Sequence, residues 1–429
     1  MWFSSWLRRR LSNPVPQNRN PHHFRPRLEA LEDRWLPSQI GLTVTSLADS
    51  GPGTLRAAIL TADADATKQS DKFTIAVNVS GTIDLQSPLP DLNASIAIQG
   101  LGAGSLTVER AAGFSFASAI VTVDAGQSAS LAGLTIANGN AGGIFNNGGT
   151  LTVTGCTLSG NFAFNGGGID NVLGKLAVTD STFTGNSVAP AGAGGAIGNF
   201  GGDMTVADST LSGNSAPAAF LNGVLLAGGV GGGIVNSSSV SYSGGTLTVT
   251  AGTLTLTGST LSGNSATYGG GICNDYSATL VVRGDILGTA TVQGRTLPGN
   301  SAVGGGGIYN DGMLTVQQST LSGNTAVSDG GGIFNANGLT VQQSTLTGNT
   351  AGSDGGGIYN DSAYIVTVQQ STLSGNTATN AGGGIFNGAS GTLMIDDSTV
   401  CDNFAALGAD LYNLGVASIN DSDVCAIAS

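Results

Sequence analysis

Charged residues are scarce in this chain of 429 residues, and side chains suited to catalysis or metal binding are scarcer still. Asp, Glu, Lys and Arg make up 10% of the chain, and both histidines, His22 and His23, lie near the N-terminus. The rest of the chain therefore has no imidazole for acid–base catalysis or metal binding. The four cysteines show no CxxC or zinc-type spacing, and no apolar run suits a membrane helix, so we expect no transmembrane segment.

Positive charge is concentrated at the N-terminus. Residues 1–40 contain seven of the 14 Lys and Arg residues and three of the 27 acids, which leaves 7 basic and 24 acidic groups, a net charge of −17, in residues 41–429. Such a body repels phosphate backbones, so we expect no nucleic-acid partner.

Glycine is abundant instead, with 70 residues, and it occurs within a repeated unit. The stretch GGGIYNDGMLTVQQSTLSGN (305–324) returns as GGGIFNANGLTVQQSTLTGN and as GGGIYNDSAYIVTVQQSTLSGN. The period is 25 to 28 residues where the copies are tight and 36 to 38 where they carry insertions. Segments such as LTVT alternate apolar and polar residues, which indicates short strands, three per period.

Winding these units as coils of a solenoid aligns equivalent residues in adjacent coils. We therefore predict an all-β fold, a right-handed parallel β-helix of about 13 coils spaced about 4.8 Å apart. Isoleucines would form a continuous core, and glycines would occupy corners that need positive φ. Inward asparagines would hydrogen-bond from coil to coil. The predicted asparagine ladder consists of Asn146, Asn171, Asn199, Asn236, Asn274, Asn310, Asn335, Asn360, Asn387 and Asn413.

We expect three segments along the chain. Residues 1–40 form a basic, disordered export or anchoring head, residues 41–71 an entry strand and a capping helix, and residues 72–429 the β-helix. The helix is expected within 51–68, with Thr54 as N-cap and Leu55, Ile59 and Leu60 on an apolar stripe. It would cover the open edges of the first coil.

The repeats resemble right-handed parallel β-helix proteins, and specifically the GGAI and FxxN repeats of bacterial polymorphic membrane proteins. The stretch SLADSGPGTLRAAI (46–59) resembles the entry to such helices in large bacterial surface proteins. RPRLEALEDRWLPS (25–38) resembles the LEDR signature of exported planctomycete-type proteins. The resemblance implies a secreted or cell-surface protein, with a cytoplasmic location as the alternative.

Parallel β-helices also include pectate lyases and polygalacturonases, so an enzyme acting on polysaccharides is the alternative function. Such lyases use an Arg or Lys base with calcium, and the hydrolases use clustered aspartates. Beyond residue 110 the cationic residues are only Lys175, Arg283 and Arg295. A fold alone does not supply an activity, so a noncatalytic protein is favoured.

Acids at equivalent turn positions form two pairs, Asp275 with Asp311 and Asp329 with Asp354. Stacked carboxylates repel each other, and calcium could relieve this. Solvated acids screened by salt are the favoured interpretation, so we expect no cofactor and keep calcium as the alternative.

The residue between Ile and Asn is expected to face outward. In the last five coils it is Tyr309, Phe334, Tyr359, Phe386 and Tyr412, which predicts an exposed aromatic ladder. Such a ladder could contact sugar rings or a partner, or it could only stiffen the solenoid.

Two cysteines fall one coil apart, in STVCDN (398–403) and SDVCAI (422–427). One coil's separation suits a disulfide, so we predict a Cys401–Cys425 bond if the compartment is oxidising.

We therefore expect a monomeric, noncatalytic surface or secreted protein: an adhesin, an envelope component or a glycan-contacting rod. Its partners would be polysaccharide or cell-envelope components. A polysaccharide lyase or glycoside hydrolase is the alternative, and a repeat without a ligand is the third interpretation.

Overall fold

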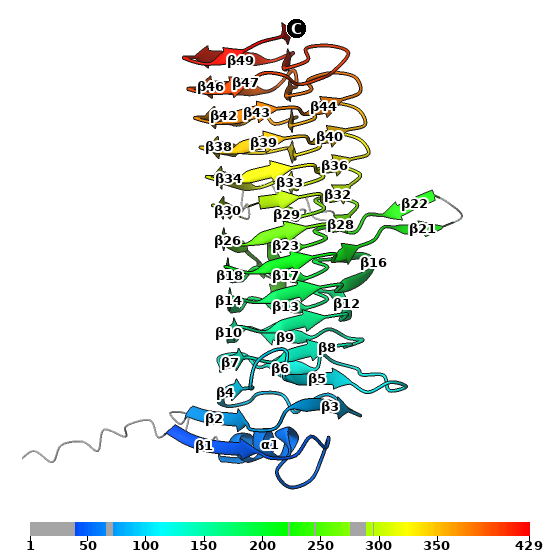
Figure 1. Cartoon of the computed structure of the whole chain (residues 1–429), viewed down its shortest axis with the longest axis vertical. Helices are drawn as coiled ribbons and strands as arrows, with labels where there is room; N and C mark the ends of the chain where they lie inside the picture. Colours follow the sequence, from blue (N-terminus) through cyan, green and yellow to red (C-terminus); the bar gives the residue numbers. More distant parts are fainter. Residues whose placement is uncertain (1–38, 66–71, 222–223, 244–245, 275–288, 295) are drawn as a thin grey trace, which may run out of the picture. The chain divides into compact units, whose positions relative to one another are not determined.

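The computed structural model describes residues 39–65, 72–221, 224–243, 246–274, 289–294 and 296–429. Residues 37–429 form one compact unit, which we describe by itself. Figure 1 shows its strands stacked in parallel layers from the N-terminal to the C-terminal end. The predicted right-handed parallel β-helix is confirmed.

The first face of the coil, sheet 1, has 14 strands and contains the LTVQ segments. Its members are β1 (Gln39–Val44), β2 (Lys72–Val77), β4 (Ser95–Gln99), β7 (Ser128–Ala132), β10 (Thr150–Thr154), β14 (Lys175–Thr179), β18 (Asp203–Ala207), β26 (Thr253–Thr257), β30 (Thr289–Gln293), β34 (Met313–Gln317), β38 (Leu339–Gln342), β42 (Ile365–Gln369), β46 (Thr392–Asp396) and β49 (Val416–Asn420).

The second face, sheet 2, contains the STL segments in a stack of seven strands and a stack of six. The seven are β3 (Gly81–Leu85), β5 (Leu106–Arg110), β8 (Thr135–Ala137), β11 (Thr157–Ser159), β15 (Thr182–Thr184), β19 (Thr210–Ser212) and β27 (Thr260–Ser262). The six are β31 (Thr296–Pro298), β35 (Thr320–Ser322), β39 (Thr345–Thr347), β43 (Thr372–Ser374), β47 (Thr399–Val400) and β50 (Asp423–Val424).

The third face, sheet 3, has eight strands, and six of them are only two residues long. They are β12 (Phe162–Asn165), β16 (Ser187–Ala193), β20 (Ser215–Ala216), β28 (Ser265–Ala266), β32 (Ser301–Ala302), β36 (Thr325–Ala326), β40 (Thr350–Ala351) and β44 (Thr377–Ala378). The expectation of three strands per coil was wrong for these coils. Two-residue strands are too short to show an alternating pattern.

The fourth face, sheet 4, has 12 strands and contains the Ile-x-Asn segments. They are β6 (Val121–Val123), β9 (Ile144–Asn147), β13 (Ile169–Val172), β17 (Ile197–Phe200), β23 (Ile234–Ser237), β29 (Ile272–Asn274), β33 (Ile308–Asn310), β37 (Ile333–Asn335), β41 (Ile358–Asn360), β45 (Ile385–Asn387), β48 (Leu411–Asn413) and β51 (Ile427–Ala428).

Isoleucine pairs with isoleucine from one coil to the next. Ile308 is in register with Ile333, and Ile333 with Ile358, and all three side chains are fully buried. Burying a side chain of this size is worth about 1.5–3 kcal/mol, so each coil adds to one continuous core.

Glycine makes this close stacking sterically feasible. Gly330 has φ 68°, and a Cβ atom there would lie 2.6 Å from the carbonyl oxygen of Ile333 in the same coil. A Cβ atom on Gly331 would lie 2.6 Å from the carbonyl oxygen of Gly356 in the next coil. The glycine run is therefore required both by backbone conformation and by the approach of neighbouring coils.

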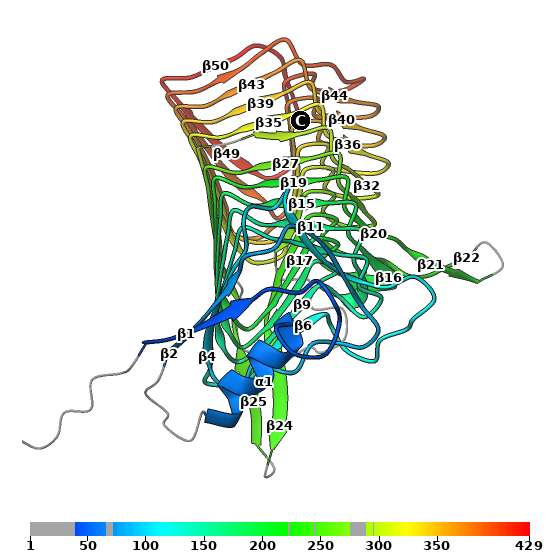
Figure 2. The ribbon, with the colours of Figure 1, turned by 60° about the horizontal axis from the view of Figure 1, so that its bottom comes forward.

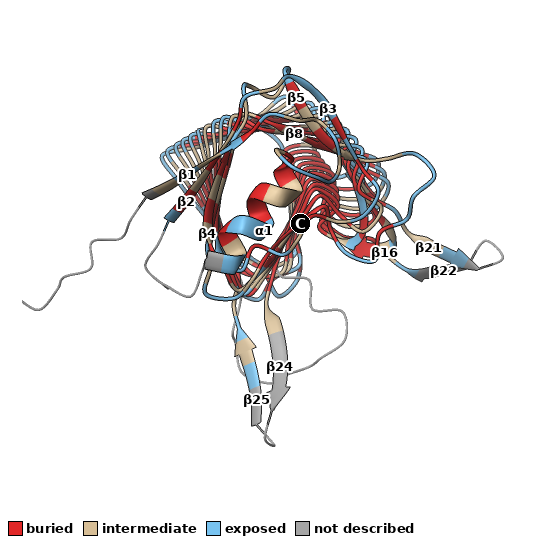
Figure 3. Ribbon diagram, turned by 90° about the horizontal axis from the view of Figure 1, so that it is seen from below, coloured by how far each residue is buried: buried red, intermediate tan, exposed pale blue. Residues whose placement is uncertain are grey.

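The N-terminal end of the unit is covered by α1 (Leu55–Asp65). Figure 3, which looks along the coil axis from this end, shows the helix lying across the first coil. The hydroxyl of Thr54 accepts a hydrogen bond from the Ala57 amide at 3.2 Å, as expected of an N-cap. Leu55, Ile59 and Ala62 join the core. The prediction for Leu60 was wrong: it is 53% exposed, because it lies five residues after Leu55 and points away from the buried face.

Two insertions leave the coil as antiparallel hairpins, β21 (Ala219–Leu221) with β22 (Val224–Ala227) and β24 (Ser239–Ser243) with β25 (Thr246–Thr250). Figure 2 shows both projecting from the coil.

Candidate functional site

The five aromatic residues of the predicted ladder lie in β33, β37, β41, β45 and β48. Ring centroids are 4.8 Å apart for Tyr309–Phe334, 5.0 Å for Phe334–Tyr359, 4.9 Å for Tyr359–Phe386 and 5.5 Å for Phe386–Tyr412. The interplanar angles lie between 8° and 25°, so the rings are stacked face to face.

All five rings are half-buried, whereas the sequence predicted an exposed ladder. The reason is the stacking itself: each inner ring covers the faces of its neighbours and presents only its edge. A ligand would therefore meet a strip of ring edges and tyrosine hydroxyls rather than open ring faces.

Two outward-facing residues in earlier coils are covered rather than exposed. Val235 in β23 and Cys273 in β29 occupy the same position as the ladder rings, yet they are 1% and 0% exposed. Together with Val230 they form a small second core on the outer face of sheet 4, packed against Phe200 and Tyr268. Segments that enter sheet 4 from sheet 3 cover this part of the face, which the pattern of the strand alone does not reveal.

Acidic side chains lie beside the ladder. Burial and, to a smaller extent, the nearby charges of Asp361, Asp329 and Asp354 together raise the pKa of Tyr359 to about 12. The Tyr359 hydroxyl therefore stays protonated at physiological pH and can donate a hydrogen bond.

The carboxylates of Asp329 and Asp354 already have protein donors. Asp329 accepts hydrogen bonds from the Asp354 amide at 3.1 Å and from the Ser328 hydroxyl at 2.6 Å. Asp354 accepts from the Ala381 amide at 2.9 Å and from the Ser353 hydroxyl at 3.1 Å. The two amide bonds join successive coils, and all four bonds relieve the need for a cation between the two carboxylates.

The calcium hypothesis also named Asp275 and Asp311. Asp275 lies outside the described residues. Within the described ranges, no group of three or more His, Cys, Asp or Glu side chains could hold a metal ion.

A hollow of about 530 Å³ opens beside β9, β12 and β13. Its lining includes three phenylalanines, Phe145, Phe162 and Phe164, and one titratable residue, Asp170. Phe162 and Phe164 are 43% and 65% exposed, so their rings remain accessible at the rim. The pairing of β12 with β16 in sheet 3 has a register shift between Ala163 and Asn165, so the wall of the hollow is irregular there.

Asp170 lies in the Ile-x-Asn position of β13, between Phe145 of β9 and Gly198 of β17. A Cβ atom on Gly198 would lie 2.7 Å from the ring of Phe200, so a side chain at position 198 would require that ring to move. The carboxyl group is thus surrounded mainly by apolar atoms. This burial raises its pKa from 3.8 to about 7. Its Oδ1 atom is buried and has no hydrogen-bond partner among the described residues.

Asp170 occupies the position that the sequence predicts to face outward, but it was not predicted as a site residue. The available signal was its isolation: it is an acid in a position that is otherwise aromatic, apolar or glycine in neighbouring coils. The hollow itself is formed by residues 117–119, 140–145 and Ala189, and only folding brings these together.

All ten asparagines of the predicted ladder are joined from coil to coil. The Nδ2 of each donates to the Oδ1 of the next over 2.6–2.9 Å, from Asn146 to Asn413. A second ladder from Asn161 to Asn403 does the same on the STLSGN side and ends on the carboxylate of Asp410. The Oδ1 of Asn146, at the start of the first ladder, has no partner among the described residues. The other buried amides are satisfied in this way and stabilise the stack, so the asparagines are structural side chains.

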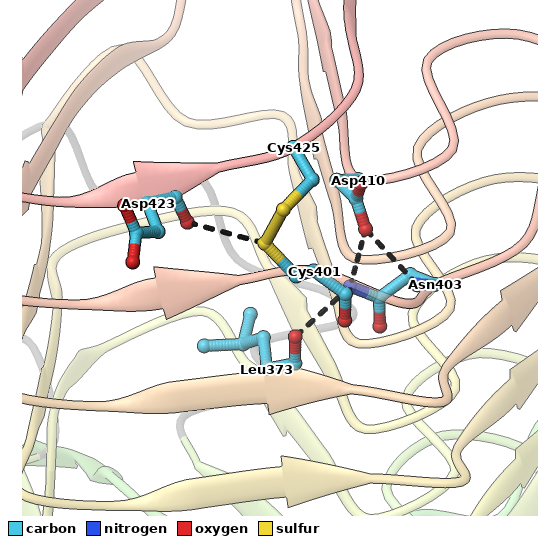
Figure 4. Close-up of a disulfide and its surroundings, with 6 residues drawn as sticks. All are labelled: Leu373, Cys401, Asn403, Asp410, Asp423 and Cys425. Carbon is cyan, nitrogen blue, oxygen red and sulfur yellow. Dashed lines mark hydrogen bonds between the residues drawn. A yellow bond between two sulfur atoms is a disulfide. The ribbon is translucent and has the colours of Figure 1, made fainter.

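Cys401 and Cys425 are joined by a disulfide with a Cα–Cα distance of 5.1 Å. Figure 4 shows the bond linking the last two coils, next to Asn403 and Asp410. Cys156 and Cys273 are buried elsewhere in the unit. Burial raises the pKa of the Cys156 thiol, so it stays protonated and unreactive.

Among the described residues, no helix has the length and hydropathy of a membrane-spanning segment. Two of the insertions that lengthen the repeat are the hairpins described above. A third, at 276–294, lies mostly outside the described residues.

One sequence family matches part of this chain. Residues 343–361 match the Chlamydia polymorphic membrane protein repeat. No curated protein shows significant sequence similarity to the chain.

Solved structures with similar folds share little sequence. The catalytic domain of a GH87 alpha-1,3-glucanase in complex with nigerose is 12% identical, with a TM-score of 0.43, over 90% of this chain and 66% of that one. The A-module of the Azotobacter vinelandii mannuronan C-5 epimerase AlgE6 is 13% identical, with a TM-score of 0.46, over 90% and 99%. The catalytic unit of a GH87 alpha-1,3-glucanase from Streptomyces thermodiastaticus is 14% identical, with a TM-score of 0.35, over 91% and 70%. These similarities concern the fold.

Proposed function

We propose that this chain is a noncatalytic, secreted or cell-surface β-helix protein that contacts neutral glycans along its aromatic ladder. The observation that carries the proposal is the unbroken stack of five rings from Tyr309 to Tyr412, which presents a ridged strip of ring edges along the coil axis.

The strip suits an extended ligand with a repeating structure. Tyrosine hydroxyls recur at every second coil, at Tyr309, Tyr359 and Tyr412, or about 10 Å apart from the spacing of β-strands. A linear glycan presents chemically equivalent hydroxyl groups at regular intervals and can meet such donors repeatedly. Each single contact is weak, and several along one chain add up.

The charge beside the strip selects against acidic glycans. Asp329, Asp354 and Asp361 raise the pKa of Tyr359, so their negative potential extends to the strip. Uronate or sulfate groups would be repelled there, whereas neutral sugars would not be.

The match of residues 343–361 to a repeat of polymorphic membrane proteins supports the proposed surface location. The matched residues include Tyr359 of the ladder. We further propose that residues 1–40, with their LEDR stretch, serve in export or anchoring, that residues 41–71 provide the entry and cap, and that residues 72–429 act as a monomeric β-helix. Residues 1–38 of this head, which include the LEDR stretch, lie outside the described residues.

The second candidate is a polysaccharide lyase or glycoside hydrolase centred on Asp170. The raised pKa of Asp170 favours this enzyme function, because a carboxyl group with a pKa of about 7 can act as a general acid at neutral pH. Glycoside hydrolysis generally needs a pair of carboxyl groups, and Asp170 is the only one lining the hollow. The noncatalytic function is therefore favoured.

A glycan array followed by titration of the best neutral glycan tests the proposal. Tyr359→Ala should weaken binding about 2- to 10-fold, which corresponds to the loss of one hydrogen bond from the tyrosine hydroxyl. Tyr364→Ala is the matched control, because Tyr364 belongs to the same coil, is 46% exposed and lies outside the stack. Equal affinity for both variants, or preference for acidic glycans, would contradict the proposal.

An assay for reducing sugars and unsaturated products on the same glycans separates the two candidates. Binding without turnover supports the noncatalytic function. Turnover that is lost in Asp170→Asn but kept in Tyr359→Ala would establish the enzyme instead.

A further inference from the structure

We propose that the hollow around Asp170 binds an organic ammonium group, with the carboxylate as counter-ion and the rings of Phe145, Phe162 and Phe164 as its apolar walls. The site is separate from the aromatic ladder and does not depend on glycan binding there.

The carboxyl group of Asp170 lacks a counter-ion among the residues that line the hollow. Its Oδ1 is buried without a hydrogen-bond partner among the described residues, and buried polar atoms in proteins are nearly always paired. Residues lining the hollow include no Lys, Arg or His, so no protein cation neutralises the carboxylate from the wall. A cationic ligand in the hollow would supply the missing counter-charge to the carboxylate.

The chemistry of the walls decides which cation fits. A hard metal ion such as Ca²⁺ takes six to eight oxygen ligands, whereas this hollow supplies one carboxylate and apolar rings. Aromatic faces attract alkylammonium groups, which are large, weakly hydrated cations, and exclude water from around them. Phe162 and Phe164 are exposed at the rim, so their rings are available to a ligand that enters from solvent.

The net charge of the rest of the chain also favours a cationic ligand. Residues 41–429 carry a net charge of −17, which attracts cations in general and repels anionic ligands. Elements packed around Asp170, namely residues 117–119, residues 140–145, β12 and Ala189 of β16, contribute no other titratable group to the lining. The ionisation of Asp170 alone therefore sets the charge of the hollow.

This ionisation predicts a pH dependence. The pKa of Asp170 is raised to about 7 by burial, so the carboxylate is about one-tenth populated at pH 6 and nine-tenths at pH 8. A cation that does not titrate should bind about tenfold more tightly at pH 8 than at pH 6. Binding in turn lowers the pKa of Asp170, because the cation favours the ionised form.

Tetramethylammonium chloride is the first probe, titrated into the full chain and followed by NMR or calorimetry at pH 6 and pH 8. tert-Butanol, which has a similar shape and no charge, is the matched ligand control. We expect saturable binding of tetramethylammonium at pH 8, about tenfold weaker binding at pH 6, and at least tenfold weaker binding of tert-butanol at pH 8. Equal binding of the two probes, or no binding of tetramethylammonium at either pH, would overturn the proposal.

Three variants locate the site. Asp170→Asn should reduce tetramethylammonium affinity at pH 8 at least tenfold and abolish its pH dependence. Phe164→Ala, at a 65% exposed position that the fold does not need, should weaken binding about 2- to 5-fold. Asp180→Asn, which removes an exposed acid outside the hollow, should leave it unchanged. If Asp180→Asn lost tetramethylammonium binding to the same extent as Asp170→Asn, the cation would be attracted by the overall negative charge and not by the hollow, and the proposal would be wrong.

The natural ammonium group could belong to an amino sugar or to a lysine side chain. Glucosamine with N-acetylglucosamine as its neutral control tests the first source, and Nα-acetyl-lysine amide with its Nζ-acetylated form tests the second. Tyr359→Ala should not affect any of these, so failure of the ladder proposal and failure of this one can be distinguished.

Discussion

At the scale of single residues, Asp170 has the least favourable environment for its charge. It lies in the Ile-x-Asn position, which carries a tyrosine or phenylalanine in the last five coils, and its carboxyl group is desolvated without a compensating cation among the residues that line the hollow. A group in such an environment costs folding free energy whenever it ionises. Its presence there is therefore better explained by a ligand than by stability.

The stability of the chain should reveal this cost. The folded-state pKa of Asp170, about 7, exceeds the ordinary value of 3.8, so the folded state holds its proton more tightly than the unfolded state. Protonated Asp170 therefore contributes to the free energy of unfolding at low pH, and this contribution is lost as pH rises from about 4 to 7. Asp170→Asn should therefore match the parent near pH 4 and exceed it by about 1–2 kcal/mol at pH 8, after discounting for solvent screening.

Urea unfolding of both proteins at the two pH values measures this difference. Asp180→Asn serves as the control and should show no such pH-dependent gain. A parent protein that is as stable as Asp170→Asn at pH 8 would contradict the desolvation argument.

Substitution of Asn335 tests how much the asparagine ladder contributes to stability. It is fully buried, accepts from Asn310 at 2.7 Å and donates to Asn360 at 2.9 Å. Asn335→Ala should lower the free energy of unfolding by about 2–3 kcal/mol, because it leaves buried partners unsatisfied. Gln342→Ala removes a half-buried amide with contacts of 3.4 Å on the outside of the coil, and should cost less than about 0.5 kcal/mol. Equal losses in denaturant titrations would show that the ladder contributes nothing specific.

At the scale of elements, α1 covers the first coil by means of one face only. Leu55, Ile59 and Ala62 lie on that face at helical spacing and are buried in the core, whereas Leu60 points to solvent. A matched pair of substitutions within one helix can therefore separate packing from helix propensity.

Ile59→Ala should destabilise the N-terminal coils by about 2–4 kcal/mol, because it removes a fully buried side chain and leaves a cavity. Leu60→Ala should change stability by less than about 0.5 kcal/mol, since its side chain is 53% exposed and alanine is a good helix former. Hydrogen exchange of β1, β2 and β4 provides the measurement. Similar effects of the two substitutions would mean that α1 does not pack as described.

At the scale of the described unit, a solenoid depends on contacts between neighbouring coils, so its ends open first. The N-terminal end is covered by α1, and the C-terminal coils are tied together by Cys401–Cys425. Without the bond, the last coil would be held only by pairing with the coil before it.

Reduction of the disulfide should increase hydrogen exchange in β49, β50 and β51 at least tenfold and leave β9 to β29 unchanged. The bond closes a loop with a sequence separation of 24, so its loss would release up to about 3 kcal/mol of chain entropy to the unfolded end. The Cys401→Ser variant should behave like the reduced protein without added reductant. A uniform change along the whole unit would contradict this end-first behaviour.

The sequence by itself determined the register of this solenoid. Copies of Ile-x-Asn and STLSGN recur with little variation, and only one winding brings Ile308, Ile333 and Ile358 into neighbouring layers while satisfying the asparagine amides. The alternating LTVQ segments and the capping residue Thr54 act locally, so their structure could be predicted from local physics.

The tertiary structure decided which of the repeated positions are accessible. Cys273 and Tyr309 occupy equivalent positions, but Cys273 is covered in a cluster with Val230 and Tyr268, whereas Tyr309 stays half-exposed. The hollow around Asp170 likewise arises where three coils and an irregular part of sheet 3 meet. A repeat pattern specifies which residues stack, because stacking depends on neighbouring coils alone, whereas exposure depends on everything that packs over the face.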